Sequence, residues 1–228
     1  MIVVIEGADG VGKTTCIKTL IQKYNYKPFP TAFPTYKLEK TSATPMHVRT
    51  LLKDYLMEGK REEIGDFLFQ MANVVDKVVH APLIEELNQS TDIYLVDRYR
   101  TTGYVYGVTS MIESKTFDEY TIRMICEESL KLIPTVTLEV LLWADPRILM
   151  QRIELRNEVK STYERYAFLD SLCQEFKNFY SRHPKINQCT VWADQEPDDL
   201  AKCVDSSIRA FLELPTYVES VIHAEQIM

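Results

Sequence analysis

A glycine-rich segment near the N-terminus restricts the fold of this chain more than any other feature. Residues 7–14 have the sequence Gly-Ala-Asp-Gly-Val-Gly-Lys-Thr, which matches the pattern G-x-x-x-x-G-K-S/T. The segment follows a β-branched run at residues 2–5 and precedes a stretch with helical spacing of apolar residues, from about Lys13 to Tyr24. A strand, a glycine turn and a helix in this order wrap a phosphate chain with backbone N–H groups. The sequence therefore predicts a nucleoside triphosphate site, where Lys13 bridges the outer phosphates and the Thr14 hydroxyl holds Mg²⁺.

The other apolar runs predict a parallel sheet. Buried strands are expected at residues 2–5, 93–96, 136–143 and 189–192, with a short second strand at residues 29–33. Helices are predicted at residues 13–24, from 46 to about 56, from about Glu62 to 87, at 117–132, from Pro146 and from Pro197. Strands that alternate with helices indicate an α/β fold of three layers, a five-stranded parallel sheet flanked by helices, as in P-loop NTPases.

Length and composition fit one globular domain. The chain has 228 residues, of which 46% are hydrophobic and 26% charged. We predict a single domain over residues 1–213, followed by an extension at 214–228. The net charge of −7 argues against nucleic acid as a partner, and the lack of an apolar run of about 18 residues argues against a membrane span. Five widely spaced cysteines without a C-x-x-C pair favour a reducing, cytoplasmic location.

Two charged residues follow the strand at residues 93–96. Because the carboxyl ends of parallel strands face the ligand crevice, Asp97 is expected either to hold Mg²⁺ or to contact the acceptor. Arg98 offers a forked, permanently charged donor for a second phosphate. A GTPase would carry D-x-x-G at this point and N-K-x-D later in the chain, and neither is present there. A nucleoside kinase would not need Arg98 as a phosphate clamp, so the residues favour an acceptor that already carries a phosphate.

With these motifs in their order, the chain resembles the thymidylate kinase family over most of residues 1 to about 213. The motifs are Glu6-Gly7 at the start of the P-loop, Phe33-Pro34, Tyr55-Leu56, Leu68-Phe69 with Ala72-Asn73, Asp97-Arg98-Tyr99 with Thr102-Gly103 and Tyr106, Pro146 with Arg152 and Arg156, and Ala193-Asp194. The P-loop alone is common. The spaced set from Asp97 to Tyr106 is much more specific.

The resemblance implies transfer of the γ-phosphoryl group of ATP to dTMP, giving dTDP for dTTP synthesis, with Mg²⁺ as cofactor. It implies that Asp9 accepts a hydrogen bond from the deoxyribose 3′-hydroxyl. It also implies that Phe69 stacks on the pyrimidine and that Tyr106 fills the space of a ribose 2′-hydroxyl. Phe69 could instead be an ordinary core residue, and Tyr106 and Thr102 could serve packing between loop and helix. The resemblance also suggests a homodimer packed through helices near residues 62–87 and 103–132.

The site residues expected from the loop chemistry and from the resemblance form four groups. Catalysis is expected from Lys13, Arg98, Asp97 and Arg165. ATP is expected to contact Gly7, Asp9, Gly10, Val11, Gly12, Lys13, Thr14, Thr15, Arg152 and Arg156. The acceptor is expected to contact Asp9, Phe33, Tyr36, Phe69, Asn73, Arg98, Thr102, Gly103 and Tyr106, and Mg²⁺ to bind Thr14 and Asp97.

A basic segment at residues 152–166 resembles the lid of part of the family. In some members the P-loop itself carries an arginine, but here that position is Gly10. The resemblance then implies that basic residues of the lid neutralise the transferred phosphoryl group, and the lid holds Arg156, Lys160 and Arg165. Arg165 matches the lid pattern best. The same residues could instead form a solvated charged helix face.

Two residues depart from the family pattern on the acceptor side. Asn73 stands where an arginine usually reads the base, and Tyr36 stands where an arginine is usual after Phe33-Pro34. An amide still donates and accepts hydrogen bonds, but with a shorter reach and no charge. The cations that could supply the missing phosphate contact are Lys37, Lys40 and Arg49. The alternative acceptors are therefore dUMP, a 5-substituted dUMP or a broader range of deoxynucleotides, and another alternative is a nucleotide-binding protein with weakened catalysis.

Overall fold

The computed structural model describes residues 1–35, 43–156, 161 and 163–214. A sheet of five parallel strands forms its centre, in the order β2-β3-β1-β4-β5. The strands are β1 (Ile2–Glu6), β2 (Lys27–Pro28), β3 (Tyr94–Asp97), β4 (Leu138–Trp143) and β5 (Gln188–Trp192). This arrangement confirms the predicted α/β fold with a five-stranded parallel sheet.

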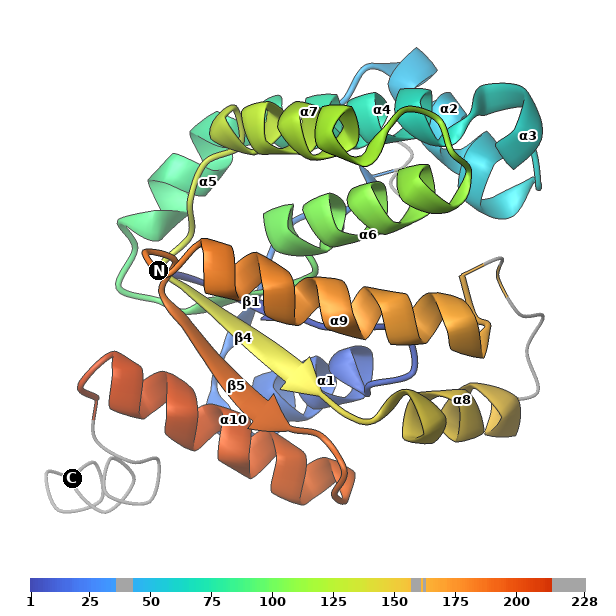
Figure 1. Cartoon of the computed structure of the whole chain (residues 1–228). Helices are drawn as coiled ribbons and strands as arrows, with labels where there is room; N and C mark the ends of the chain where they lie inside the picture. The colour runs from blue at the N-terminus through green and yellow to red at the C-terminus, as the bar shows by residue number, and fades with distance from the viewer. Residues whose placement is uncertain (36–42, 157–160, 162, 215–228) are drawn as a thin grey trace, which may run out of the picture.

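Helices cover both faces of the sheet and complete the three layers (Figure 1). On one face, α1 (Lys13–Tyr24) packs against α10 (Pro197–Phe211). On the other face, α6 (Arg100–Glu113) packs against α9 (Tyr166–Arg182), and α4 (Asp66–Val78) and α7 (Glu119–Lys131) lie against α6. The remaining helices are α2 (Met46–Met57), α3 (Arg61–Ile64), α5 (Ala81–Asn88) and α8 (Pro146–Leu155). No helix in the described part of the chain has the length and apolar character that a membrane crossing requires.

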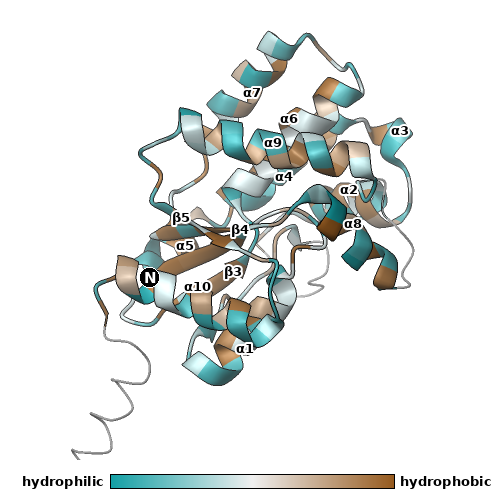
Figure 2. Ribbon diagram, turned by 60° about the horizontal axis from the view of Figure 1, so that its bottom comes forward, coloured by the Kyte–Doolittle hydropathy of each residue, from teal (hydrophilic) through white to brown (hydrophobic). Residues whose placement is uncertain are grey.

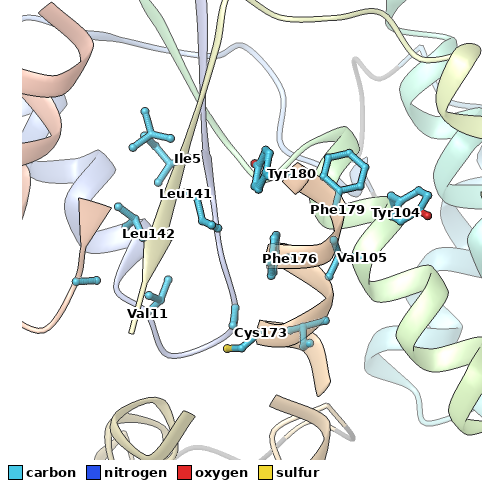
Figure 3. Close-up of a cluster of buried hydrophobic side chains, with 14 of the residues drawn as sticks. Ile5, Val11, Tyr104, Val105, Leu141, Leu142, Cys173, Phe176, Phe179 and Tyr180 are labelled. Atoms are coloured by element: carbon cyan, nitrogen blue, oxygen red, sulfur yellow. The ribbon is translucent and has the colours of Figure 1, made fainter. Parts of the chain in front are cut away.

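The core lies on both faces of the central strands. Residues 2–5 of β1 are completely buried, as expected for a strand with neighbours on both sides and helices above and below. Successive side chains of β4 point to opposite faces, so that Leu142 lies on the side of Val11 while Leu141 faces Phe176 of α9 (Figure 3). Figure 2 shows the same division, with hydrophobic strands inside and hydrophilic outer faces on the helices.

The register of β1 with its two neighbours shows which residues meet at the carboxyl edge of the sheet. Ile5 is paired with Asp97 of β3 on one side and with Val140 of β4 on the other. The loop after β1 and the residue Asp97 at the end of β3 therefore meet at one edge of the sheet, as the sequence predicted from parallel strands.

Two predicted elements were wrong. The second strand is residues 27–28 and not 29–33, because Pro28 and Pro30 lack the N–H groups that a longer ladder needs; the pairing ends with a bond from the Phe29 N–H to the Leu95 carbonyl at 3.1 Å. The long helix predicted from about Glu62 is divided into α3, α4 and α5. Gly65 has a φ of 76° between the first two, and Pro82 starts a new helix after His80.

Candidate active site

The loop between β1 and α1 has the curvature of a phosphate cradle. Gly7, Gly10 and Gly12 have φ values of 138°, 80° and 98°, which other residues rarely adopt. A Cβ atom on Gly7 would lie 2.6 Å from the Leu142 carbonyl oxygen, and one on Gly10 would lie 2.9 Å from the Leu149 carbonyl oxygen. Because β4 and α8 approach so closely, only glycine fits at these two positions. Such a backbone forms a nest for an anion.

Lys13, at the start of α1, folds back over this loop. Its ammonium donates to the Gly7 carbonyl at 3.0 Å and to the Ala8 carbonyl at 2.7 Å, and the residue is only 5% exposed. Burial, together with the charge of Arg98, lowers the pKa of Lys13 to about 8. A buried ammonium is costly unless an anion compensates it, so the position favours a bound phosphate.

Thr14 and Asp97 are brought together although 83 residues separate them. The Thr14 hydroxyl donates to Asp97 Oδ2 at 2.9 Å. The other carboxylate oxygen, Asp97 Oδ1, is buried and has no hydrogen-bond partner in the described part of the chain. A hydroxyl beside an unsatisfied carboxylate oxygen is the kind of oxygen donor set that Mg²⁺ prefers, so these two residues fit the predicted metal.

Asp9, Arg98 and Tyr106 form one hydrogen-bonded cluster beside the loop. The Arg98 guanidinium donates to one oxygen of Asp9 and lies 5.2 Å from the centre of the Tyr106 ring, and the Tyr106 hydroxyl donates to Asp9 Oδ2 at 2.8 Å. Burial acts to raise the pKa of Asp9, but the charges of Arg98 and Lys13 outweigh it and hold this pKa below its usual value. Asp9 is therefore a carboxylate that accepts hydrogen bonds. The φ of 65° at Arg98 is a strained conformation of the kind found at functional sites.

Phe69 and Asn73 lie one turn apart on α4 and face the interior. The Phe69 ring is 8% exposed and stacks on Tyr55, with ring centres 3.8 Å apart and planes 8° from parallel. The Asn73 amide nitrogen donates to the Phe69 carbonyl at 3.2 Å. Tyr55 thus covers one face of Phe69, and a base can stack only on the opposite face.

Thr102 and Gly103 lie in the first turn of α6, which packs against α4. The Thr102 hydroxyl donates to the buried carboxylate of Glu6, so it orients the start of α6. Gly103 approaches Lys77, and a Cβ atom there would lie 3.3 Å from the Lys77 ammonium nitrogen. Phe33 is buried in an aromatic cluster with Phe29, His80 and Tyr99. Tyr36 and the alternative cations Lys37 and Lys40 lie outside the described residues.

The predicted lid residues contact carboxylates and a carbonyl. Arg165 donates to Glu113 at the end of α6, and Arg156 donates to Glu164. The charge of Arg156 also contributes to the lowered pKa of Asp9, which places it near the cluster. Arg152 donates to the Ala193 carbonyl at 2.9 Å, directly after β5. Lys160 lies outside the described residues.

Sequence reasoning missed two residues at the acceptor side. Lys77 is 3% exposed and follows Phe69 and Asn73 at a spacing of four residues, on the same face of α4. The Lys77 ammonium donates to the Asn73 carbonyl at 3.3 Å, and burial lowers its pKa. The i, i+4, i+8 spacing was the available signal. Tyr163 hydrogen-bonds to Tyr55 at 2.7 Å between their hydroxyl oxygens, and no motif indicated this contact.

Comparisons with known proteins agree with this geometry. Residues 5–203 match the family model described as Thymidylate kinase. A probable thymidylate kinase of Methanococcus vannielii is 31% identical over 176 residues, covering 76% of this chain and 75% of the relative. A thymidylate kinase of Leptospira borgpetersenii is 25% identical over 213 residues, covering 92% and 94%.

Solved structures share the fold at low sequence identity. Thymidylate kinase from Candida albicans superposes with a TM-score of 0.68 at 18% identity, covering 92% of this chain and 91% of that one. A deoxyadenosine kinase from M. mycoides superposes with a TM-score of 0.66 at 13% identity, covering 92% and 100%.

Proposed function

We infer that this chain, which belongs to the thymidylate kinase family, phosphorylates dTMP with ATP to give dTDP. Membership of the family makes it a nucleoside monophosphate kinase, a phosphotransferase. The observation that carries the inference is the cluster of Asp9, Arg98 and Tyr106 beside the P-loop. In this cluster Arg98 can bind a second phosphate and Asp9 can accept a hydrogen bond from a sugar hydroxyl, both next to the triphosphate site. Asp97 and Thr14 complete the site on the donor side.

On the donor side, the P-loop binds the triphosphate of ATP. Lys13 exchanges the carbonyls of Gly7 and Ala8 for phosphate oxygens, which restores the charge balance of its buried ammonium. Thr14 and Asp97 hold Mg²⁺, which when bound neutralises charge on the phosphates. The backbone of residues 7–13 supplies the remaining donors, so the transferred group is held without a cation at Gly10.

On the acceptor side, Arg98 binds the phosphate of dTMP, and Asp9 accepts a hydrogen bond from the 3′-hydroxyl of its deoxyribose. The ionised Asp9 suits this role because it can only accept hydrogen bonds. Tyr106 donates to Asp9 and packs beside Arg98, which supports a position next to the sugar. The pyrimidine stacks on the face of Phe69 that Tyr55 leaves open, with Asn73 toward its edge.

In our proposal the lid supplies an arginine in place of the one that some family members carry in the P-loop, where this chain has Gly10. Arg165 would leave Glu113, and Arg156 would leave Glu164, to reach the transferred phosphoryl group. Arg152 would remain near the adenine, held at the Ala193 carbonyl. Phosphoryl transfer depends mainly on positioning and charge neutralisation. An arginine that moves to the transferred phosphoryl group would supply the second of these.

A panel of acceptors tests the assignment. The release of ADP is measured with dTMP, dUMP, dCMP, dGMP and dAMP under identical conditions. We expect dTMP to give the highest kcat/KM, followed by dUMP, because Phe69 and Asn73 face a flat pyrimidine. Turnover of dGMP or dAMP at or above that of dTMP would overturn the thymidylate assignment. The short, uncharged Asn73 favours the alternative of a broader acceptor range, in which dUMP approaches dTMP.

We further propose a homodimer, a cytoplasmic location and one domain over residues 1–213. Support for the dimer comes from apolar side chains exposed on neighbouring helices, Leu68 and Val75 on α4 and Tyr120 and Met124 on α7. All five cysteines are free, in keeping with a reducing compartment. The extension predicted after residue 213 lies outside the described residues from 215 onward.

A further inference from the structure

A second cavity lies at the edge of the sheet opposite the P-loop. It has a volume of about 630 Å³ and lies between the start of α6, the segment before β4 and the loop from α9 to β5. Figure 1 shows that the two chain segments entering β4 and β5 run side by side near the N-terminus. The lining residues that matter here are Arg100, Glu139, Arg182, His183, Lys185 and Ile186. The volume is within the range of small-molecule sites.

Arg100 is the unusual residue of this cavity. It is 8% exposed, and its Nε atom is buried and has no hydrogen-bond partner among the described residues. Its hydrogen bond is a long one, from Nη1 to the Ile133 carbonyl at 3.5 Å. No carboxylate of the described chain lies within 4.0 Å of the guanidinium. The charge of Glu139 acts on Arg100 without a direct ion pair. A buried guanidinium that no carboxylate contacts is costly, so an anion in the cavity would stabilise it.

The other charges around the cavity leave it positive. Arg182 and His183 are paired with carboxylates outside the lining, with Glu175 at 2.7 Å and Glu127 at 2.9 Å. The carboxylate of the lining is Glu139, which accepts hydrogen bonds from Thr101 at 2.6 Å and Tyr180 at 2.9 Å. Burial and the neighbouring Glu6 raise the pKa of Glu139 to about 7, while the charge of Arg100 acts against this rise. Even a fully ionised Glu139 balances only one of the two cations Arg100 and Lys185 in the lining.

We propose that this cavity binds a small molecule through a phosphate group, with Arg100 as the anchor and Lys185 at the rim. A phosphate accepts hydrogen bonds from several directions, which suits a forked guanidinium on one wall and an ammonium on another. The volume leaves room for an organic group beside the phosphate. The site differs from the P-loop and does not depend on which acceptor the enzyme uses.

Calorimetric titration tests this site on the full chain. The P-loop and the acceptor site are first saturated with a non-hydrolysable ATP analogue and dTMP, and the complex is titrated with inorganic phosphate, pyrophosphate or dTTP. We expect one further binding event. It should weaken by about tenfold or more in Arg100→Met, because a charge-assisted hydrogen-bond pair is lost. Tighter binding of dTTP than of pyrophosphate would identify a nucleotide as the source of the phosphate, and equal binding would identify the free anion.

A second variant, Lys185→Glu, reverses a charge at the rim of the cavity. It tests the same site if Arg100→Met does not fold. Lys185 is exposed, so Lys185→Glu leaves the core intact, and it should weaken the same event by about fivefold. Lys202→Glu on α10 is the matched control, since it makes the same change at an exposed position outside the cavity. Absence of a further binding event in the parent chain would overturn the proposal. Equal affinities in the Lys185→Glu and Lys202→Glu chains would also overturn it.

Discussion

At the scale of single residues, the site contains three charged groups, Lys13, Asp9 and Arg98, and burial disfavours the charged form of each. Lys13 is 5% exposed, and Asp9 and Arg98 neutralise each other beside it. Their pKa values move in the directions that this packing requires: that of Lys13 falls to about 8, that of Asp9 falls, and that of Arg98 rises. The three charges therefore lie beside one another before the substrate arrives, and such preorganised charges can stabilise a phosphoryl group.

Arg98 gives the sharpest prediction at this scale. Arg98→Ala should lower kcat/KM for dTMP by about 10²- to 10³-fold, because it removes the forked phosphate donor. The affinity for a non-hydrolysable ATP analogue should change by less than about threefold, since the P-loop binds it. Arg98→Lys, which keeps the charge but not the fork, should recover only part of the loss. Steady-state kinetics and equilibrium binding measure the two effects, and an unchanged kcat/KM in Arg98→Ala would refute the clamp. Lys13→Ala, by comparison, should abolish transfer.

Lys13 predicts a dependence of activity on pH. Its pKa of about 8 in the free protein means that the ammonium is lost as the pH rises through 8. We therefore expect kcat/KM for ATP, which reports the free enzyme, to fall above pH 8. A bound triphosphate favours the ammonium, so the corresponding fall in kcat should occur at higher pH. Kinetics between pH 6 and 10 measure both profiles, and coinciding falls would contradict the assignment.

At the scale of elements, the sequence predicted what depends on local pattern. Helix α1 was predicted with its observed bounds, because a P-loop and an amphipathic run define both ends. The strands β1, β3, β4 and β5 were predicted within two residues, because each is a β-branched or apolar run. Helix α9 was not identified, and α6 was expected only as part of the helical region near residues 103–132 that the family resemblance suggests. Helix α6 contains two glycines and many buried polar residues, so its pattern differs from an amphipathic surface helix.

In the site, too, the sequence predicted only the contacts that follow from local pattern and strand order. The Thr14–Asp97 pair follows from strand order, so the sequence could predict it. The stacking of Tyr55 on Phe69 joins α2 to α4, and the burial of Lys77 depends on Gly103 of α6. Contacts of this kind depend on how helices pack across one another, and no single sequence carries that information locally.

The packing of α4 on α6 gives a prediction for elements. A Cβ atom on Gly107 would lie 2.5 Å from the side-chain amide carbon of Gln70, which is itself 4% exposed. Gly107→Ala should therefore lower the free energy of unfolding by about 1–3 kcal/mol through overpacking. Gln70→Ala in the same chain should remove the clash, so the double variant should be more stable than the sum of the single effects predicts. Chemical denaturation of the four chains measures this coupling, and strictly additive effects would contradict it.

At the scale of the whole molecule, charge and shape agree with a small anionic substrate. The net charge is −7, yet the charges of Lys13 and Arg98 act on each other at one edge of the sheet, and the charge of Arg156 acts on Asp9 there. Membership of the family implies nucleotide substrates, and a few local cations are sufficient to attract them although the total charge is negative. The outer layer formed by α4 and α7, which both pack on α6, exposes the apolar side chains Leu68, Val75, Tyr120 and Met124. On α7 these lie among the exposed charged residues Glu119, Glu128 and Lys131.

This outer layer predicts the oligomeric state. Val75 and Met124 are 40% and 48% exposed, and they stand on neighbouring helices that both pack against α6. If they form the centre of a dimer interface, Met124→Glu buries an unpaired charge there and should convert the dimer into a monomer of 26.5 kDa. Met46→Glu is the control, because Met46 is 76% exposed on α2 and makes the same change elsewhere. Sedimentation velocity of the three chains gives the masses. A parent chain that sediments as a monomer, or a Met124→Glu chain that stays dimeric, would contradict an interface through α4 and α7.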